Sequence, residues 1–264
     1  MQPLSVLKRK IYLISFVVIF IVFTPLVVLY AMGYRYGHVK PTGGVYVVIN
    51  EPYAEVYVDR INTKQNGLLD RSVLIQNVSP GKHLVFVGKQ GYRSWAKEIE
   101  VFSERVTEIH ANIFPIQVDL IPIDNDDVFS DDEKKGIRLL FATSTLAIAE
   151  KDYRDTHLSY STSTLAVSWV GTRNSRPFFF CNVHLCDNQF LISVPRIRSF
   201  DFYPSKDDTI VLSREDGVYV AELDSRSNQN QFPLIMAPKT DVAVYDREYV
   251  FIRKSDGSIY RANI

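Results

Sequence analysis

The sequence is poor in cysteine and has no excess charge of either sign. Its two cysteines are too few for a disulfide scaffold or for a four-cysteine zinc site. Its 30 Lys and Arg residues balance its 30 Asp and Glu residues, so the formal net charge is zero. A general nucleic-acid binder needs a large basic surface, and this balance argues against one. We therefore expect no nucleic acid among the partners of this protein.

Common catalytic motifs are also missing. The sequence contains no G-x-S-x-G elbow, no H-E-x-x-H zinc motif and no glycine-rich loop that would cradle a phosphate. The 12 glycines fall mostly in predicted turns. These absences favour a protein that is not an enzyme and holds no cofactor or metal.

One long hydrophobic run is present near the N-terminus. Residues 11–33, IYLISFVVIFIVFTPLVVLYAMG, contain no charged side chain. At about 1.5 Å per residue, a helix of this length crosses a hydrocarbon core of roughly 30 Å. Such a helix satisfies its own backbone polar groups, for which lipid offers no partner. The run therefore predicts one transmembrane helix in a lipid bilayer, preceded by a cytoplasmic segment at residues 1–10.

The flanks of this run suggest its orientation. Lys8, Arg9 and Lys10 precede it closely, whereas Arg35 and Lys40 follow it, so positive charge modestly favours a cytoplasmic N-terminus. The alternative is a cleaved signal peptide. The apolar run is longer than the usual h-region of about 7–15 residues, which favours a retained anchor. In both interpretations the remainder of the chain lies outside the cytoplasm.

After a juxtamembrane spacer at residues 34–42, residues 43–115 show the period-two pattern of short β-strands. The stretches 45–49, 56–59, 83–86, 96–102 and 106–113 read as half-buried strands. Turn signals separate them, namely Glu51-Pro52, Asn66-Gly67, Ser79-Pro80-Gly81 and Gln90-Gly91. This succession predicts a small β-sandwich.

The same region carries a resemblance to a known family. The stretches GGVYVVINEPYAEVYVDR and LIQNVSPGKHLVFVGKQGYRSWAKEIEV resemble the PEGA domain of bacterial and archaeal surface proteins. Pro80-Gly81, Gly91-Tyr92 and Trp95 match the pattern of that family. The tetrapeptide Pro-Glu-Gly-Ala is replaced by Glu51-Pro52-Tyr53-Ala54, so that turn is rebuilt. The preceding GYRYG is similar to the juxtamembrane segment of anchored members, and the resemblance covers roughly residues 30–115. It implies a surface or wall-associated location without naming a ligand.

Two aromatic residues of this motif allow two interpretations. Tyr92 and Trp95 follow the bend at Gly91, and an aromatic pair in that place can cap a sandwich core. Alternatively, Tyr92 and Trp95 form an exposed stacking platform for a sugar or a peptide. The structural role already explains both residues and is the favoured one.

Residues 116–135 are rich in acidic side chains and read as a linker. A calcium loop needs oxygen ligands at alternate positions, a Gly at the sixth position and a Glu at the twelfth. Counted from Asp124, these positions hold Phe129 and Lys135, so the EF-hand pattern fails. We therefore expect a solvated acidic linker.

Residues 136–264 predict a second region of short antiparallel strands. The pentapeptide TSTLA begins at Thr143 and again at Thr162, and the stretch Phe200–Leu223 is echoed at the C-terminus. Each of the longer copies has an Asp-Gly turn, at Asp216-Gly217 and at Asp256-Gly257. Strand pairs at about 40-residue spacing resemble blades of β-propellers, and this length holds about three blades, fewer than the usual four to eight. The prediction is a propeller-like partial repeat, closed against the first domain or by homo-oligomerisation.

The cysteines and histidines suggest little chemistry. Cys181 and Cys186 enclose a four-residue loop, and outside the cytoplasm a disulfide across such a hairpin is plausible. His184 lies between them, but no second Cys or His pair accompanies it, so a metal site is not expected. His83 and His110 fall in predicted strands, where structural roles are commoner. Glu98 and Glu100 share one face of a strand, which is typical of a solvated sheet.

Taken together, the sequence predicts a mainly β protein with one N-terminal transmembrane helix. The leading hypothesis is a single-pass, extracytoplasmic envelope protein that acts as a non-enzymatic binding or scaffolding module at the cell surface. Its expected partners are the bilayer and a cell-wall polymer or an envelope protein. The runner-up is a membrane-anchored hydrolase or sensor with its site in residues 136–264. A deep pocket with His157 or His184 beside a carboxylate and a serine would favour that alternative.

Overall fold

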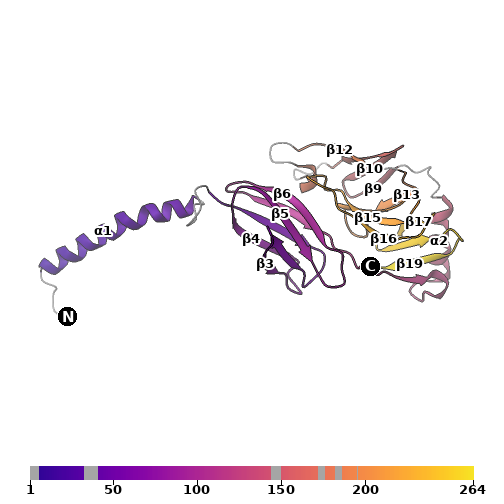
Figure 1. Ribbon diagram of the computed structural model, residues 1–264, viewed down its shortest axis with the longest axis horizontal. Helices are drawn as coiled ribbons and strands as arrows, with labels where there is room; N and C mark the ends of the chain where they lie inside the picture. Colours follow the sequence, from indigo (N-terminus) through magenta and orange to yellow (C-terminus); the bar gives the residue numbers. More distant parts are fainter. Residues whose placement is uncertain (1–5, 33–40, 144–149, 172–175, 182–185, 195) are drawn as a thin grey trace.

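A computed structural model describes residues 6–32, 41–143, 150–171, 176–181, 186–194 and 196–264. The first copy of TSTLA, apart from Thr143, the GYRYG segment and His184 lie outside the described residues. Helix α1 (Val6–Ala31) extends away from the β-rich part of the chain (Figure 1). Its stretch from Lys8 to Ala31 is long and apolar enough to cross a membrane, and its side chains are exposed. The expected N-terminal apolar helix is therefore confirmed, and its insertion and orientation stay predictions.

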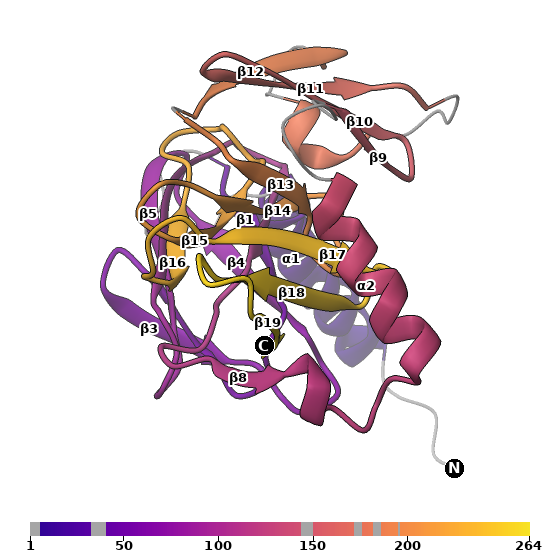
Figure 2. The ribbon, with the colours of Figure 1, turned by 90° about the vertical axis from the view of Figure 1, so that its right-hand side faces the viewer.

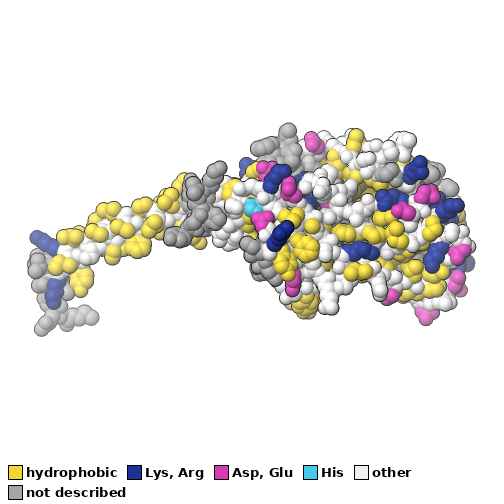
Figure 3. All heavy atoms as spheres, in the orientation of Figure 1, with side chains coloured by type: hydrophobic (Ala, Val, Ile, Leu, Met, Phe, Trp, Pro, Cys, Tyr) yellow, Lys and Arg dark blue, Asp and Glu magenta, His cyan; other side chains and the backbone are white. Residues whose placement is uncertain are grey.

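Basic and apolar side chains are distributed along α1 as an anchor requires. Lys8, Arg9 and Lys10 are exposed at its start, and hydrophobic side chains cover the rest of the shaft (Figure 3). The hydroxyl of Thr24 donates a hydrogen bond to the carbonyl oxygen of Phe20 at 2.6 Å. This bond satisfies the Thr24 hydroxyl within the helix itself, as an apolar surrounding demands.

Residues 41–115, which we call the N-terminal unit, form two sheets that pack on one core. The first sheet has the order β4-β1-β7, with β1 (Gly43–Ile49), β4 (Ser72–Val78) and β7 (Val106–Ala111). The second has the order β3-β2-β5-β6, with β2 (Glu55–Val58), β3 (Ile61–Gln65), β5 (Gly81–Gly88) and β6 (Trp95–Val101). Strand β7 pairs with β1 in parallel, and the other pairs are antiparallel. Alternate residues of β1, β5 and β6 enter the core between the sheets.

Residues 116–264, which we call the C-terminal unit, contain three four-stranded antiparallel sheets. The first sheet consists of β9 (Glu150–Tyr153), β10 (Thr156–Ser161), β11 (Thr164–Trp169) and β12 (Gln189–Ser193). The second consists of β13 (Ser199–Phe202), β14 (Thr209–Ser213), β15 (Val218–Glu222) and β16 (Gln231–Ile235). The third consists of β17 (Asp241–Tyr245), β18 (Tyr249–Arg253), β19 (Ile259–Asn263) and β8 (Asp119–Pro122). The expected mainly β fold is thus confirmed.

The three sheets of the C-terminal unit stack in chain order. Strand β14 is buried on both faces, because Ile210 and Leu212 join the apolar cluster shared with the first sheet, whereas Val211 joins the cluster shared with the third. Helix α2 (Asp131–Thr143) lies along the third sheet (Figure 2), where Ile137 and Phe251 share a further cluster. In the described part of the chain, the sheets do not join into a closed ring. The helix covers an apolar face that an additional sheet would otherwise have to cover.

The two Asp-Gly turns connect strands as the sequence predicts. Asp216-Gly217 joins β14 to β15, and Asp256-Gly257 joins β18 to β19. Gly257 adopts a φ of 87°, which side-chain-bearing residues rarely adopt. A Cβ atom at Gly217 would lie only 2.3 Å from the carbonyl oxygen of Ile235. Both turns therefore depend on glycine, for different physical reasons.

The prediction of a solvated linker at residues 116–135 is wrong. Strand β8 pairs with β19 and completes the third sheet, and a short 3-10 helix η1 (Ile123–Asn125) follows it. Ile123 and Phe129 are buried, and the carboxylate of buried Asp126 is paired with Arg261. The hydrogen bonds from Arg261 hold the pKa of Asp126 below its ordinary value, although burial acts in the opposite direction. The acidic composition hid these partners, because they come from the far end of the chain.

Candidate binding site at the junction of the two units

The junction between the two units is built around Lys97. Strand β6 directs Trp95 and Lys97 to the same side, and both side chains are only 1% exposed. The Lys97 ammonium lies 2.7 Å from a carboxylate oxygen of Glu222, 2.7 Å from the carbonyl oxygen of Asp224 and 3.4 Å from its carboxylate. The indole N–H of Trp95 donates a hydrogen bond to the other Glu222 oxygen at 3.0 Å. A buried ionic contact therefore joins β6 to the end of β15.

Arg226 completes this contact on the C-terminal side. Its guanidinium makes two hydrogen bonds of 2.9 Å to the carboxylate of Asp224, and a third of 2.9 Å to the carbonyl oxygen of Glu108 on β7. Burial by itself raises the pKa of Asp224, but Arg226 and Lys97 hold it below the ordinary value. Asp224 is therefore ionised at neutral pH. Burial raises the pKa of Glu222 above its ordinary value, and the contact with Lys97 opposes this rise, so the arrangement places two cations beside two carboxyl groups.

A second polar contact lies nearby on β7. His110 Nδ1 is 2.6 Å from the carboxylate of Asp208, and its Nε2 is 3.2 Å from that of Glu108. The imidazole also packs on the ring of Phe178, with 4.1 Å between the ring centroids. Burial by itself lowers the pKa of His110, but the hydrogen bonds to the two carboxylates outweigh it and the pKa is raised. Asn112 adds a hydrogen bond of 2.8 Å to the hydroxyl of Thr209.

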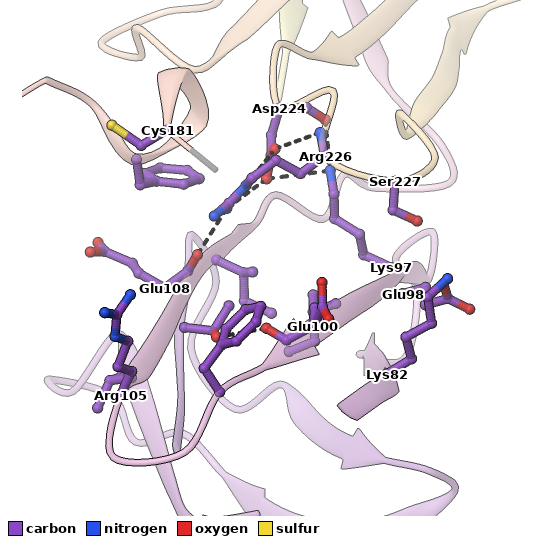
Figure 4. Close-up of a pocket in the computed structure, with 16 residues that line it drawn as sticks. Lys82, Lys97, Glu98, Glu100, Arg105, Glu108, Cys181, Asp224, Arg226 and Ser227 are labelled. Carbon is purple, nitrogen blue, oxygen red and sulfur yellow. Dashed lines mark hydrogen bonds and ion pairs between the residues drawn. The ribbon is translucent and has the colours of Figure 1, made fainter. Parts of the chain in front are cut away.

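Beside these contacts lies a cavity of about 700 Å³ between the two units (Figure 4). This volume falls within the range of about 300–1,000 Å³ that is typical of small-molecule sites. Its apolar lining comprises Ile99, Phe102, Val106, Ile109, Phe178 and Cys181. Its charged lining comprises Lys82, Lys97, Glu98, Glu100, Arg105, Glu108, Asp224 and Arg226. The lining of the cavity thus combines apolar side chains with charged side chains of both signs.

The two cysteines form a disulfide on the C-terminal side of this cavity. Cys181 and Cys186 are bonded, and their Cα atoms are 4.0 Å apart. Cys181 directly follows the 3-10 helix η2 (Phe178–Phe180), whose first residue packs on His110. Phe179 and Phe180 anchor η2 in the apolar cluster of the first sheet. The disulfide therefore closes the loop whose near end forms part of the cavity wall.

The alternative of an exposed aromatic platform at Tyr92 and Trp95 is wrong. Trp95 is buried beneath the C-terminal unit, and its polar N–H is engaged by Glu222. Tyr92 is half-buried against the sandwich core and carries the Lys89 ammonium 4.3 Å from its ring centroid. The structural interpretation of this pair therefore applies, with the addition that Trp95 contacts the second unit. No sequence pattern near Trp95 indicated that contact.

Of the described residues, His157 does not build a hydrolytic site at the cavity. His157 stands opposite Asp152 on β9 and opposite Ser168 on β11, and its Nδ1 is 2.8 Å from Asp152. Among the described residues, no hydrogen bond joins this imidazole to the serine. His157, Asp152 and Ser168 lie on the first sheet of the C-terminal unit, whereas the cavity lies at the junction of the two units. His83 has structural partners, because its two nitrogens contact Asp59 and the carbonyl oxygen of Ser79.

Sequence reasoning missed the residues that build the junction. The signal was present in β6, where Lys97 occupies an inward position between Trp95 and Ile99. A lysine at such a position requires a buried anion, but the sequence does not say which one. Glu222 and Asp224 are distant in the chain and follow an apolar stretch that reads as an ordinary strand.

Comparisons with known proteins add no family. No protein-family model matches the chain, and a search of curated proteins finds no match.

Proposed function

We propose that this protein is a single-pass, membrane-anchored envelope protein whose two β units act as one rigid, non-enzymatic binding or scaffolding module outside the cytoplasm. The observation that carries the proposal is the buried contact of Lys97 with Glu222 and Asp224. Breaking such a contact would leave charged groups buried without a partner, which is energetically costly. The two units are therefore expected to move together. The cavity beside it gives this rigid body a preformed place to bind.

The extracytoplasmic location rests on two further features. Disulfides persist in oxidising compartments, and the Cys181–Cys186 bond suits that setting. The basic cluster Lys8, Arg9 and Lys10 precedes the apolar helix, which favours a cytoplasmic N-terminus. A cell-wall polymer or an envelope protein is the proposed partner.

We further propose that the N-terminal unit is PEGA-like and the C-terminal unit propeller-like. For the first, support comes from Tyr53, which has a φ of 58° at the place where the family tetrapeptide has its glycine. Asn66 stabilises this rebuilt turn, because its side chain bonds the backbone of Ala54 and of Glu51 at 2.7 Å each. For the second, support comes from the three four-stranded sheets, whose edge strands β9, β13 and β17 neighbour one another in order.

A topology experiment tests the location. Protease added to intact spheroplasts of cells that express the full chain is expected to digest the region after residue 40 and to leave an N-terminal tag protected. An alkaline carbonate wash should leave the chain in the membrane pellet. A variant with Ile19→Lys and Phe20→Lys should insert poorly, because each charge at the centre of a span costs about 2.5–3.5 kcal/mol.

Two outcomes would contradict this location. Digestion of the tag together with protection of the C-terminal unit would reverse the orientation. Loss of the tag from a mature chain that no longer stays in the membrane would establish the cleaved signal peptide instead. For the binding role, the full chain in detergent should be retained by purified envelope polymer, and a variant with a disrupted junction, Lys97→Ala, should be retained less.

A further inference from the structure

Most charges that line the junction cavity are already paired. Lys82 lies 2.8 Å from Glu98, and Arg226 is held by two hydrogen bonds to Asp224. Glu108 contacts His110 at 3.2 Å. These pairs neutralise most of the charge that lines the cavity. They also hold the walls in place, which favours binding because little ordering is needed afterwards.

Glu100 differs from these residues. It lies on β6, its side chain is exposed, and Figure 4 places it in the middle of the lining residues. Among the described residues, none makes a hydrogen bond or an ion pair with its carboxylate. Its backbone carbonyl accepts a bond of 2.9 Å from the hydroxyl of Thr107, which fixes the strand at this point. The cavity thus contains one carboxylate that makes no hydrogen bond or ion pair with the described residues, although Lys82 lies opposite Glu100 in the pairing of β5 with β6 and interacts with its charge.

We propose that the junction cavity binds an organic cation, an amine or guanidinium carried on an apolar body. The cation would lie on Glu100, and the apolar body would lie against Ile99, Val106 and Phe178. Val106 is 59% exposed, so the ligand would bury an apolar side chain that now faces water. A charge-assisted contact in a cleft with low-dielectric walls is stronger than the same contact on an open surface. This inference rests on the proposed function as a binding module and names the class of its ligand.

Fluorine NMR on the full chain in phosphatidylcholine nanodiscs tests the proposal. The probes are fluorinated phenethylammonium and fluorinated phenylacetate, which share an apolar ring and carry opposite charges. We expect saturable line broadening with the cation only, above the background measured with empty nanodiscs. Glu100→Gln should weaken its binding by at least about fivefold, because a charge-assisted contact is lost. Val106→Ser should weaken it less, since it removes only part of the apolar contact.

The matched control is Glu248→Gln, which makes the same charge change on the C-terminal unit, away from the cavity. It should bind the cation as the wild type does. Equal binding of the anion, or unchanged binding by Glu100→Gln, would overturn the proposal. The source of the ligand is distinguished by a third probe, an acetylated and amidated Phe-Lys dipeptide. Tighter binding of the dipeptide than of the free amine indicates a peptide, and the reverse indicates a small amine.

This experiment is separable from the test of the proposed function. A chain that binds the cation through Glu100 but leaves the membrane in a carbonate wash would contradict the anchor and keep the site. A chain that is anchored as expected but binds no cation would contradict the site and keep the anchor.

Discussion

The two faces of strand β6 carry lysine–glutamate pairs of the same chemistry in opposite environments. On one face, Lys97 lies 2.7 Å from Glu222, and the two side chains are 1% and 5% exposed. On the other face, Glu98 lies 2.8 Å from Lys82, and the two side chains are 51% and 73% exposed. The distances are nearly equal, so burial decides the energetic difference. Removing a lysine leaves a carboxylate without a cation in both cases, but water solvates only the exposed one.

The largest effect is expected from Lys97→Ala. This change leaves Glu222 and Asp224 buried without their shared cation, and we expect a loss of about 3–5 kcal/mol in the free energy of unfolding. Denaturant unfolding of the full chain in detergent micelles measures it. Because the contact joins the units, the variant should also show separate unfolding transitions for the two units. A loss below about 1 kcal/mol would mean that the buried pair resembles the exposed one.

The next effect is expected from Trp95→Phe, which keeps an aromatic ring but removes the hydrogen bond to Glu222. A bond to a charged acceptor contributes about 1.5–3 kcal/mol, and we expect a loss of this size in the unfolding free energy. The control is Trp169→Phe on the first sheet of the C-terminal unit, whose indole N–H has no hydrogen-bond partner among the described residues. If both variants lose the same unfolding free energy, packing rather than the polar contact stabilises the buried face of β6.

The contact between His110 and Asp208 makes the stability of the junction depend on pH. The pKa of His110 is raised above 6.5, so its stabilisation is complete below pH 6.5 and is lost as pH rises through the raised value. The pKa of Asp208 is lowered below 3.8, despite burial, by the hydrogen bond and charge of His110. Its contribution is therefore present above pH 3.8 and is lost as pH falls through the lowered value.

The pH test compares the wild type with His110→Gln from pH 5 to pH 9. We expect the variant to lose about 1–2 kcal/mol at pH 5 and less as pH rises. The control is His157→Gln, because Asp152, the partner of His157, is 74% exposed, and its effect should be small. A difference between His110→Gln and wild type that stays constant over this range would show that the contact acts without protonation.

The smallest effect is expected on the exposed face of β6. Lys82→Ala should leave the unfolding free energy almost unchanged, and 0.5 M salt should remove most of the small difference. The same denaturant experiment measures it. A loss comparable to that of Lys97→Ala would erase the distinction between the two faces.

Local patterns predicted much of the fold. The uncharged run at residues 11–33 predicted the apolar helix, because a membrane-spanning helix leaves a signal in consecutive residues. The alternation in β1 and the Asp-Gly pairs predicted strands and turns, since both depend on near neighbours in the chain. The prediction of a solvated linker at residues 116–135 was wrong for a related reason. Its acidic composition resembles a linker, whereas Arg261 pairs with Asp126 and β19 pairs with β8 only after folding.

The candidate site was predicted least. The disulfide of Cys181 and Cys186 is local, and it was visible as a short loop between two cysteines. Lys97 and its partners Glu222 and Asp224 come from different units, so no periodicity connects them. Trp95 was noticed as a motif residue, but its burial under the second unit was not foreseen.

By itself, the sequence determined where the chain is apolar, where its strands and turns lie, and that its charges balance overall. Each of these depends on composition or on residues within a few positions of each other. The tertiary structure decided which charges pair, because pairing depends on distances between strands that the chain order does not give. It thereby separated Lys97, which joins the two units, from Lys82, which faces water. It also placed Glu100, whose carboxylate makes no hydrogen bond or ion pair with the described residues, in a cavity that neither unit forms alone.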